Sequence, residues 1–342
     1  MQRCIEIAQN GLGTAAPNPM VGAIIVHNGK IIGEGYTSPY GGPHAEVNAI
    51  RSVADQSLLS EATLYVTLEP CAHFGKTPPC ADLIVQHQIP KVVIGLLDPH
   101  HKVAGKGIER LKRSGCEVIT GVLEEECREH HIRFLTFHEK KRPFIILKWA
   151  ETWDGFIAPE TGKRNENPEP FWITNSYSRQ RVHQWRAEVQ GILVGTQTVL
   201  DDNPKLDVRH WKGQNPLRIL FDRELRIPQS SHVLDGSSPT MVLTEVKDAS
   251  LYKQGIEYKI LDFSSALAKQ VCQVLFEQNI TSLIIEGGAK TLQTFITAKL
   301  WDEARVITGD SNFQKGIKAP TLKGKILSRN KIQGDVLSIY RP

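Results

Sequence analysis

Three side chains that bind zinc well, His44, Cys71 and Cys80, occur in the first quarter of the chain, and Glu46 follows the first of them closely. A zinc ion that performs chemistry takes three protein ligands and keeps a fourth position open for water. The three residues therefore predict a fold that brings a strand end and helix starts together around one metal ion. Glu46, at an expected helix start, would face the same water and carry its proton, because zinc lowers the pKa of water that it binds.

A structural zinc site is the main alternative, because such a site is closed by a fourth Cys or His and His73 lies near Cys71 in the sequence. Two unrelated buried thiols are the other alternative. A glutamate at this spacing is not needed in a closed site, whereas it supplies the general acid and base of zinc deaminases. We therefore predict a catalytic zinc ion with Glu46 as the catalytic residue.

Length and composition exclude several classes of protein. The 342 residues suggest two domains, and 40% hydrophobic residues are enough for buried cores. The net charge of +4 argues against a nucleic-acid or membrane partner, and no apolar run approaches the length of a membrane span. The N-terminus lacks the apolar segment of a secretory signal, so we expect a cytoplasmic protein whose six cysteines are free or bind metal.

Hydrophobic patterning predicts a first α/β domain of residues 1–142, which ends in a charged linker before Pro143. Strands are expected at 21–26, 30–36, 63–68, 91–97 and 117–120, with a hairpin turn at Asn28-Gly29, and helices at 44–53, 79–88, 106–113 and 123–137. The order favours a mixed or parallel sheet covered by helices. His130 and His131 belong to an acidic helix and are expected to be solvated.

A second α/β domain is predicted for residues 143–342. Strands are expected at 144–149, 191–195, 217–222, 241–244, 282–286 and 303–308, and helices at 176–189, 265–277 and 290–298. Residues 159–170 are rich in proline, asparagine and charge, which predicts a long loop.

Three runs in the first domain carry a family resemblance: Pro17-Asn-Pro-Met-Val-Gly22, Pro43-His-Ala-Glu46 and Thr67-Leu-Glu-Pro-Cys-Ala-His-Phe-Gly-Lys-Thr-Pro-Pro-Cys80. They resemble the deaminase half of the bifunctional riboflavin-biosynthesis family, whose two cysteines stand farther apart than in other zinc deaminases. The resemblance implies a cytidine-deaminase-like three-layer domain, zinc on His44, Cys71 and Cys80, and Glu46 as proton shuttle. The implied substrate is 2,5-diamino-6-ribosylamino-4(3H)-pyrimidinone 5′-phosphate, a small phosphoribosylated pyrimidine.

The same resemblance implies that Asn18, His73, Lys76 and Asp98 surround this substrate. Lys76 lies in a turn between two zinc ligands, from which its ammonium would reach a phosphate or ring oxygen; a solvated loop lysine is the alternative. Asn18 is also explained as a turn former, and Asp98 as a cap. His100 departs from the asparagine that is usual in the family at this position.

Three further runs, at residues 149–155, 195–209 and 284–291, follow apolar strands of the second domain. The last turns through Gly287-Gly288 into a helix, whose free N–H groups attract phosphate, although such turns are also common without a ligand. The runs resemble the reductase half of the same family, which is similar in fold to dihydrofolate reductase. The resemblance implies NADPH-dependent reduction of the ribosyl group to a ribityl chain, giving 5-amino-6-ribitylaminouracil 5′-phosphate.

The resemblance assigns two sets of contacts in this second domain. Those implied for NADPH are Ala150, Trp172, Thr198, Asp202, Gly288, Ala289, Lys290, Thr291, Leu292, Gln293 and Thr294. Those implied for the substrate are Arg186, Leu206, Arg209 and Glu286. Arginine suits phosphate because a guanidinium binds it through two hydrogen bonds, and ion-paired surface arginines are the alternative. Glu286 suits sugar hydroxyls, or a place at a helix N-terminus.

Two features depart from the reductase pattern. The 159–170 loop is longer than usual and has no clear counterpart of a serine contact, and Arg223 stands where serine is usual. We hypothesise that Arg223 holds the 2′-phosphate of NADPH. The departures keep open the alternative of a zinc deaminase with an inactive or repurposed reductase-like domain.

Two broader alternatives also remain at this point. A nucleic-acid deaminase would need basic stripes with interleaved aromatic residues, and the sequence has none. A non-catalytic zinc protein predicts that Glu46 has only a local structural role. We expect a homo-oligomer, because an exposed sheet edge favours self-association.

Overall fold

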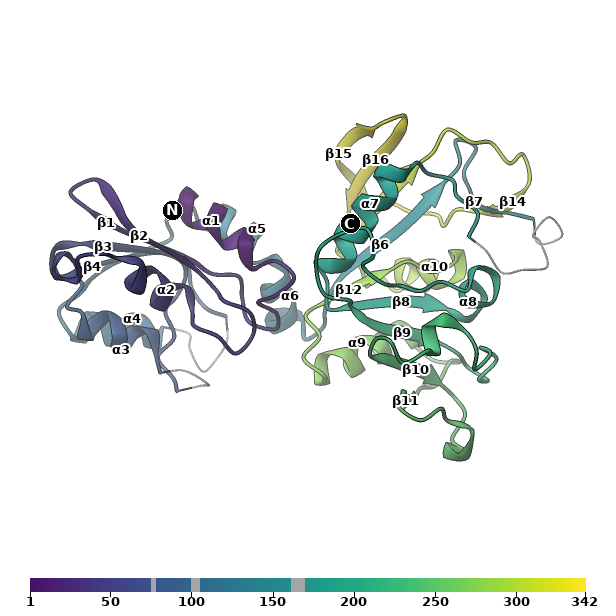
Figure 1. Cartoon of the computed structure of the whole chain (residues 1–342), viewed down its shortest axis with the longest axis horizontal. Coiled ribbons are helices and arrows are strands. Elements are labelled where there is room, and N and C mark those ends of the chain that lie inside the picture. The colour runs from purple at the N-terminus through teal and green to yellow at the C-terminus, as the bar shows by residue number, and fades with distance from the viewer. Residues whose placement is uncertain (75–77, 100–104, 161–169) are drawn as a thin grey trace. The chain divides into compact units, whose positions relative to one another are not determined.

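The computed structural model describes residues 1–74, 78–99, 105–160 and 170–342. The chain forms two compact units, Met1–Lys141 and Arg142–Pro342, so the division falls one residue before the predicted boundary (Figure 1). Within the described ranges, no helix combines the length and apolar character that crossing a bilayer requires.

The first unit is built on a five-stranded sheet in the order β2-β1-β3-β4-β5. Its strands are β1 (Gly22–His27), β2 (Lys30–Tyr36), β3 (Thr63–Leu68), β4 (Lys91–Leu96) and β5 (Glu117–Thr120). β1 pairs antiparallel with β2 and β3, whereas β3, β4 and β5 run parallel. The β1–β2 turn uses Asn28 and Gly29, both at positive φ, as expected for a tight hairpin.

Helices cover both faces of this sheet (Figure 1). They are α1 (Gln2–Ala8), α2 (Ala45–Ser52), α3 (Cys80–Gln86), α4 (Lys106–Arg113), α5 (Glu124–His130) and α6 (Ile132–Lys140). Side chains of β1 alternate between faces, so Ile24 packs with Cys4 of α1 while Ile25 joins the cluster that holds Ala49 of α2. α2 approaches β2 closely because Gly35 has no side chain: a Cβ there would lie 2.2 Å from the backbone nitrogen of Ala49.

The second unit contains a nine-stranded sheet in the order β11-β10-β9-β8-β12-β6-β13-β16-β15. Its strands are β6 (Phe144–Glu151), β8 (Gly191–Gly195), β9 (Leu217–Phe221), β10 (Thr240–Thr244), β11 (Glu257–Ile260), β12 (Ser282–Ile285), β13 (Glu303–Thr308), β15 (Lys325–Ile332) and β16 (Asp335–Arg341). The strands from β11 to β13 in this order are parallel, and the β15–β16 hairpin extends the sheet in antiparallel fashion. β7 (Phe156–Pro159) and β14 (Gly316–Lys318) form a separate ribbon.

Helices of the second unit pack on its parallel strands. They are α7 (Ser176–Ala187), α8 (Thr196–Asp202), α9 (Leu267–Glu277) and α10 (Ala289–Thr297). Leu275 of α9 and Phe295 of α10 are fully buried in one cluster with Leu147 of β6. Because the carboxyl ends of parallel strands meet at one edge, the loops after β6, β8, β9 and β12 converge there.

A buried ion pair fastens the start of the second unit. Nη1 and Nη2 of Arg142 donate to the two carboxylate oxygens of Asp302 at 2.5 and 2.7 Å. Asp302 also accepts the backbone N–H of Ile145, and Arg142 donates to the carbonyl oxygen of Pro143. The first residues of β6 are thereby fixed to the residue that precedes β13.

Two predictions for the first unit are wrong. The helix expected at 123–137 is broken at His131 into α5 and α6. The two histidines are not solvated: His131 is 2% exposed with Nε2 3.1 Å from Oγ1 of Thr67, and Nε2 of His130 lies 2.7 Å from the carbonyl oxygen of Met20. Burial lowers the pKa of both rings. The acidic residues of this segment face solvent, while the histidines form its inner side.

Candidate functional site

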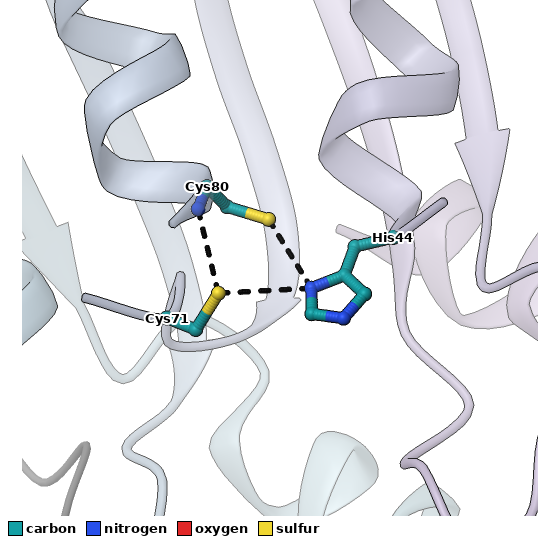
Figure 2. Close-up of side chains that lie close together, drawn as sticks. All are labelled: His44, Cys71 and Cys80. Carbon is teal, nitrogen blue, oxygen red and sulfur yellow. Dashed lines mark hydrogen bonds between the residues drawn. The ribbon is translucent and has the colours of Figure 1, made fainter. Parts of the chain in front are cut away.

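The three potential zinc ligands of the first unit lie together (Figure 2). His44 directly precedes α2, Cys71 follows β3 and Cys80 is the first residue of α3. Nδ1 of His44 lies 3.6 Å from Sγ of Cys71 and 3.3 Å from Sγ of Cys80. One donor atom from each residue lies within 4.8 Å of the others, so the fold directs two helix starts and one strand end at a single point.

Among the residues that the structure describes, this donor group has no fourth His, Cys, Asp or Glu member. His73, the candidate fourth ligand of a closed site, is exposed and lies outside the group. The backbone N–H of Cys80 donates to Sγ of Cys71 at 3.4 Å, which fixes the two sulfur atoms relative to each other. Three donors and an open position are the arrangement of a catalytic zinc site rather than a structural one.

The charges of the group suit a zinc ion. Hydrogen bonds from Cys80 and His44 lower the pKa of Cys71 to about 4, so this sulfur is a thiolate at neutral pH. The pKa of Cys80 is raised because its thiol donates to Cys71 and is buried. The hydrogen bond to Cys71 also raises the pKa of His44. Thiolate sulfur and imidazole nitrogen are donors that zinc prefers, so these residues fit the metal.

Glu46 lies in the first turn of α2, is 3% exposed and stays outside the donor group. Burial, and then the negative charge of Cys71, raises its pKa to about 7. A carboxyl group with a pKa near neutrality takes and gives protons with similar ease. Glu46 therefore has the burial and the chemistry of a proton shuttle beside the donor group.

A second buried carboxylate, Glu69, is absent from the candidates that sequence analysis identified. It lies just after β3, is 4% exposed and accepts backbone N–H groups of described residues, including those of Gly105 and Gly107 at 3.0 Å and of Asp98 at 3.4 Å. Glu69 thus ties the start of α4 and the segment at Asp98 to the strand that leads into Cys71. Its signal in the sequence is a charged residue placed directly after a buried strand.

The other residues implied for the deaminase substrate differ in their exposure to solvent. Asn18 is half-buried in the loop before β1, whose Pro19 carbonyl oxygen accepts a hydrogen bond from Thr37 at 3.0 Å. Asp98 is buried and His73 exposed. Lys76, and the departure at His100, lie outside the described residues.

The second unit has a cavity of about 820 Å³ at the carboxyl ends of its parallel strands. Its lining includes most of the contacts implied in this unit: Ala150, Trp172, Arg186, Thr198, Asp202, Leu206, Arg209, Glu286, Gly288, Ala289, Lys290, Thr291 and Thr294. α10 starts close to β8 because Gly195 has no side chain: a Cβ there would lie 2.6 Å from Oγ1 of Thr291. A helix start with free N–H groups beside a large cavity fits the phosphates of a dinucleotide.

Two of the implied NADPH contacts do not line this cavity. The side chain of Leu292 is fully buried in the core, and Oε1 of Gln293 accepts the backbone N–H of Thr321 at 3.0 Å. The run 288–294 spans nearly two helical turns, and only one side of a helix faces a given cavity. A cofactor contact at these two positions would therefore not come from side chains in the cavity.

Arg186, Glu286 and Lys148 form a buried ion cluster on the cavity. Nε and Nη2 of Arg186 donate to the two oxygens of Glu286 at 2.8 Å each, and Nζ of Lys148 lies 3.6 Å from Oε2. Burial opposes ionisation of Glu286, but Arg186 and Lys148 together lower its pKa to about 2. Two cations around one carboxylate leave a net positive charge, which suits an anionic ligand. Sequence analysis missed Lys148, whose signal is a lysine inside an otherwise buried parallel strand.

The segment that carries two implied substrate contacts is held by α7. Leu206 adopts a left-handed conformation with φ of 52° and lines the cavity. The carbonyl oxygen of the next residue, Asp207, accepts hydrogen bonds from Nδ1 of His183 at 2.8 Å and from Nη1 of Arg186 at 3.1 Å. The Asp207 carboxylate pairs with Arg209. Two donors one turn apart on α7 thus fix this backbone.

Two arginine side chains at the cavity have partners. Arg223 lines the cavity, and its Nε donates to Oε2 of Glu245 at 2.7 Å. The guanidinium of Arg179, which sequence analysis did not identify, lies over the ring of Trp172 at 4.8 Å from the centroid. Most of the expected long loop, residues 161–169, lies outside the described residues.

Comparison with known proteins agrees with this division of sites. The family model of the cytidine and deoxycytidylate deaminase zinc-binding region matches residues 1–96, and that of the RibD C-terminal domain matches residues 143–309. Riboflavin biosynthesis protein RibD of Aquifex aeolicus is 40% identical over 322 residues, covering 93% of this chain and 88% of the relative. The chain belongs to the RibD family. RibD of Bacillus amyloliquefaciens is 39% identical over 342 residues, with coverage of 98% and 87%.

Solved structures of RibD proteins have the same fold. The diaminohydroxyphosphoribosylaminopyrimidine deaminase/5-amino-6-(5-phosphoribosylamino)uracil reductase of Thermotoga maritima has a TM-score of 0.89 and 38% identity, covering 100% of this chain and 97% of its own. Acinetobacter baumannii RibD has a TM-score of 0.87 and 32% identity, with the same coverage. These matches confirm the expected fold class: a cytidine-deaminase-like α/β domain followed by a RibD reductase domain.

Membership in the RibD family also defines the kind of enzyme. The chain is a bifunctional riboflavin biosynthesis enzyme, with a zinc-dependent deaminase and an NADPH-dependent reductase. Nothing in the comparisons supports the alternative of an inactive reductase-like domain.

Proposed function

We propose that residues 1–142 deaminate 2,5-diamino-6-ribosylamino-4(3H)-pyrimidinone 5′-phosphate and that residues 143–342 reduce the ribosyl group of the product to give 5-amino-6-ribitylaminouracil 5′-phosphate. The convergence of His44, Cys71 and Cys80 beside buried Glu46 carries this proposal. The name of the Thermotoga maritima relative joins a deaminase of a phosphoribosylated diaminopyrimidine to a reductase of a phosphoribosylated uracil, which supports the order of the two reactions.

In the proposed deaminase reaction, His44, Cys71 and Cys80 hold the zinc ion, which supplies an activated water when it is bound. Glu46 takes a proton from this water and gives it to the exocyclic amino group, which leaves as ammonia while the ring carbon gains the oxygen. Burial keeps both transfers away from bulk solvent. Asn18, His73, Lys76 and Asp98 are proposed to orient the substrate, with Glu69 holding the segment at Asp98.

In the proposed reductase reaction, NADPH supplies a hydride to C1′ of the ribosyl group when it is bound. Its phosphates are proposed to lie at the start of α10, and its other parts against Ala150, Trp172, Thr198 and Asp202. Arg186, Arg209 and Leu206 are proposed to bind the substrate. Glu286 is held as a carboxylate by its two cations, so it accepts hydrogen bonds from sugar hydroxyls.

One assay tests both parts of the proposal. Zinc-loaded protein receives the diamino substrate and NADPH, and ammonia and NADPH oxidation are measured in the same sample. We expect both signals, and NADPH oxidation is expected to require intact Glu46. Ammonia without NADPH oxidation would contradict the reductase proposal, and neither signal with zinc bound would contradict the substrate assignment altogether.

We also propose that the chain forms homo-oligomers and works in the cytoplasm. β15 is an edge strand of the nine-stranded sheet, and its Ile326 and Leu327 are 49% and 47% exposed. An exposed edge with apolar side chains offers a surface for a second copy. All six cysteines are free, which suits a reducing compartment. Sedimentation of the full chain tests the first proposal, which a monomer at micromolar concentration would contradict; cell fractionation tests the second.

A further inference from the structure

His183 lies on α7 and lines the reductase cavity, although sequence analysis did not identify it. His183 is 3% exposed, and its Nδ1 lies 2.8 Å from the carbonyl oxygen of Asp207. A carbonyl oxygen only accepts hydrogen bonds, so Nδ1 carries the proton of the ring. In the neutral tautomer that this contact selects, Nε2 has a free lone pair and is an acceptor.

The position of Nε2 points to a ligand contact. Among the described residues, no side chain or backbone group donates to Nε2. Nε2 has no partner in the described part of the chain but is not fully enclosed by protein atoms, so part of its surface is accessible. Since His183 is almost wholly buried and lines the cavity, the cavity is the space from which Nε2 is reached.

The groups around His183 keep the ring neutral. Burial, and then the positive charges of Arg186 and Arg209, lower the pKa of His183 to about 4. The ring of His210 packs edge-on against it, with 4.8 Å between centroids. The guanidinium groups of Arg186 and Arg209 can only donate hydrogen bonds. Nε2 is therefore an uncharged acceptor beside two cations. A phosphate oxygen offers lone pairs and does not fit such an atom, whereas an O–H or N–H group does.

We propose that His183 is a specificity-determining residue of the reductase: its Nε2 accepts a hydrogen bond from a donor group of the substrate, while Arg186 and Arg209 bind the anionic groups. The donor is a sugar hydroxyl or an N–H of the aminopyrimidine. The inference rests on the proposed function, because it takes the substrate of this cavity to be the phosphoribosylaminouracil. His183 and Arg186 stand three positions apart on α7, so one helix face presents both types of contact.

Two variants separate this role from a structural one. His183→Asn keeps an N–H for the Asp207 carbonyl oxygen but has no acceptor at the place of Nε2, and His183→Phe lacks both. We expect each variant to weaken binding of 5-amino-6-ribitylaminouracil 5′-phosphate about 10-fold, the value of one hydrogen bond in a buried site. The Kd of NADPH, measured by its fluorescence, is expected to stay within 2-fold of the wild-type value.

A second probe, ribose 5-phosphate, identifies the donor. Weaker binding of both probes to His183→Asn would assign a sugar hydroxyl, and weaker binding of the uracil compound alone would assign a ring or amino N–H. Wild-type affinity of His183→Asn for both probes, with loss only in His183→Phe, would overturn the proposal and leave His183 as a support of the Asp207 segment.

Nitrogen-15 NMR of the imidazole gives an independent readout. The proposal expects Nε2 without a proton both in the free protein and with the uracil compound bound. A protonated Nε2 in that complex would overturn it, because the ring would then be a donor to phosphate. Failure of wild-type protein to oxidise NADPH with the deaminated substrate would contradict the proposed function instead, and the binding of ribose 5-phosphate would still test the acceptor.

Discussion

The zinc centre takes its donors from two helix starts and one strand end, whereas the lining of the reductase cavity includes four strand ends and residues of α7, α8 and α10. The difference is clearest in two buried glutamates. Burial, and then a neighbouring thiolate, raise the pKa of Glu46 to about 7, while two cations lower the pKa of Glu286 to about 2. One carboxyl group is thereby suited to move protons and the other to hold charge. Burial alone does not decide what a glutamate does; its charged neighbours decide it.

The strongest test of this comparison is Glu46→Gln. We expect ammonia release to fall by about 10³-fold, because glutamine cannot carry a proton between water and the leaving amine. NADPH oxidation with the deaminated substrate is expected to stay at the wild-type level, which makes the second unit the internal control. Zinc content, measured by mass spectrometry, should not change, and persistent ammonia release with zinc bound would contradict the shuttle role.

Glu286→Gln tests the charge-holding role. Removing one partner of a buried ion pair leaves Arg186 and Lys148 without a counter-charge, so we expect the free energy of unfolding of the second unit to fall by about 3 kcal/mol. The matched control is Glu245→Gln, whose partner Arg223 is largely exposed, and here a much smaller loss is expected because solvent screens the pair. Equal losses in chemical denaturation would contradict the assignment.

The same glutamate sets a pH dependence. The pKa of Glu286 is lowered on folding, so its contribution to stability is complete above its ordinary value of 4.5 and is lost as the pH falls from there toward about 2. We expect the difference in unfolding free energy between wild type and Glu286→Gln to shrink across this range. A difference that grows as the medium is acidified would show that the sign is wrong.

Glu69→Gln sharpens the picture of the first unit. The amide puts an NH₂ group against backbone N–H donors and loosens the segment at Asp98, so we expect the KM of the deaminase to rise about 10-fold. Zinc content and NADPH oxidation with the deaminated substrate should be unchanged. Loss of zinc would instead assign Glu69 to the metal site.

The smallest expected effect belongs to Arg223→Ala. Solvent screens an exposed contact with the 2′-phosphate of NADPH, so the preference for NADPH over NADH should fall only about 5-fold. The ratio of the two kcat/KM values measures it, with Glu245→Gln as the matched variant that frees the arginine. An unchanged preference in Arg223→Ala would remove this residue from cofactor recognition.

Sequence reasoning works best where chemistry depends on residue types at short spacing. The donors His44, Cys71 and Cys80 stand out because zinc accepts few side chains, and Gly29 marks its turn because few residues adopt positive φ. Strands such as β6 and β8 are evident from continuous apolar runs. The sequence alone did not indicate α1, α8 or β15, which are short or largely exposed and therefore lack a clear periodicity.

Long-range pairing accounts for the residues that sequence reasoning missed. Lys148 is a candidate because it pairs with Glu286, which lies far along the chain, and His183 because it bonds the carbonyl oxygen of Asp207. His131 looks solvated among acidic neighbours, and only the sheet position of Thr67 explains its burial. No local pattern carries such information, because each partner is brought in by the topology of the sheet.

The buried pair of Arg142 and Asp302 has a consequence for the inheritance of such enzymes. Both partners lie in the second unit, and Lys141, the residue before them, is exposed. A coding sequence that began at position 142 would still encode both partners of the buried ion pair that fixes its first strand. We therefore expect the gene to tolerate division at this point, so that each unit is inherited and expressed as a separate enzyme.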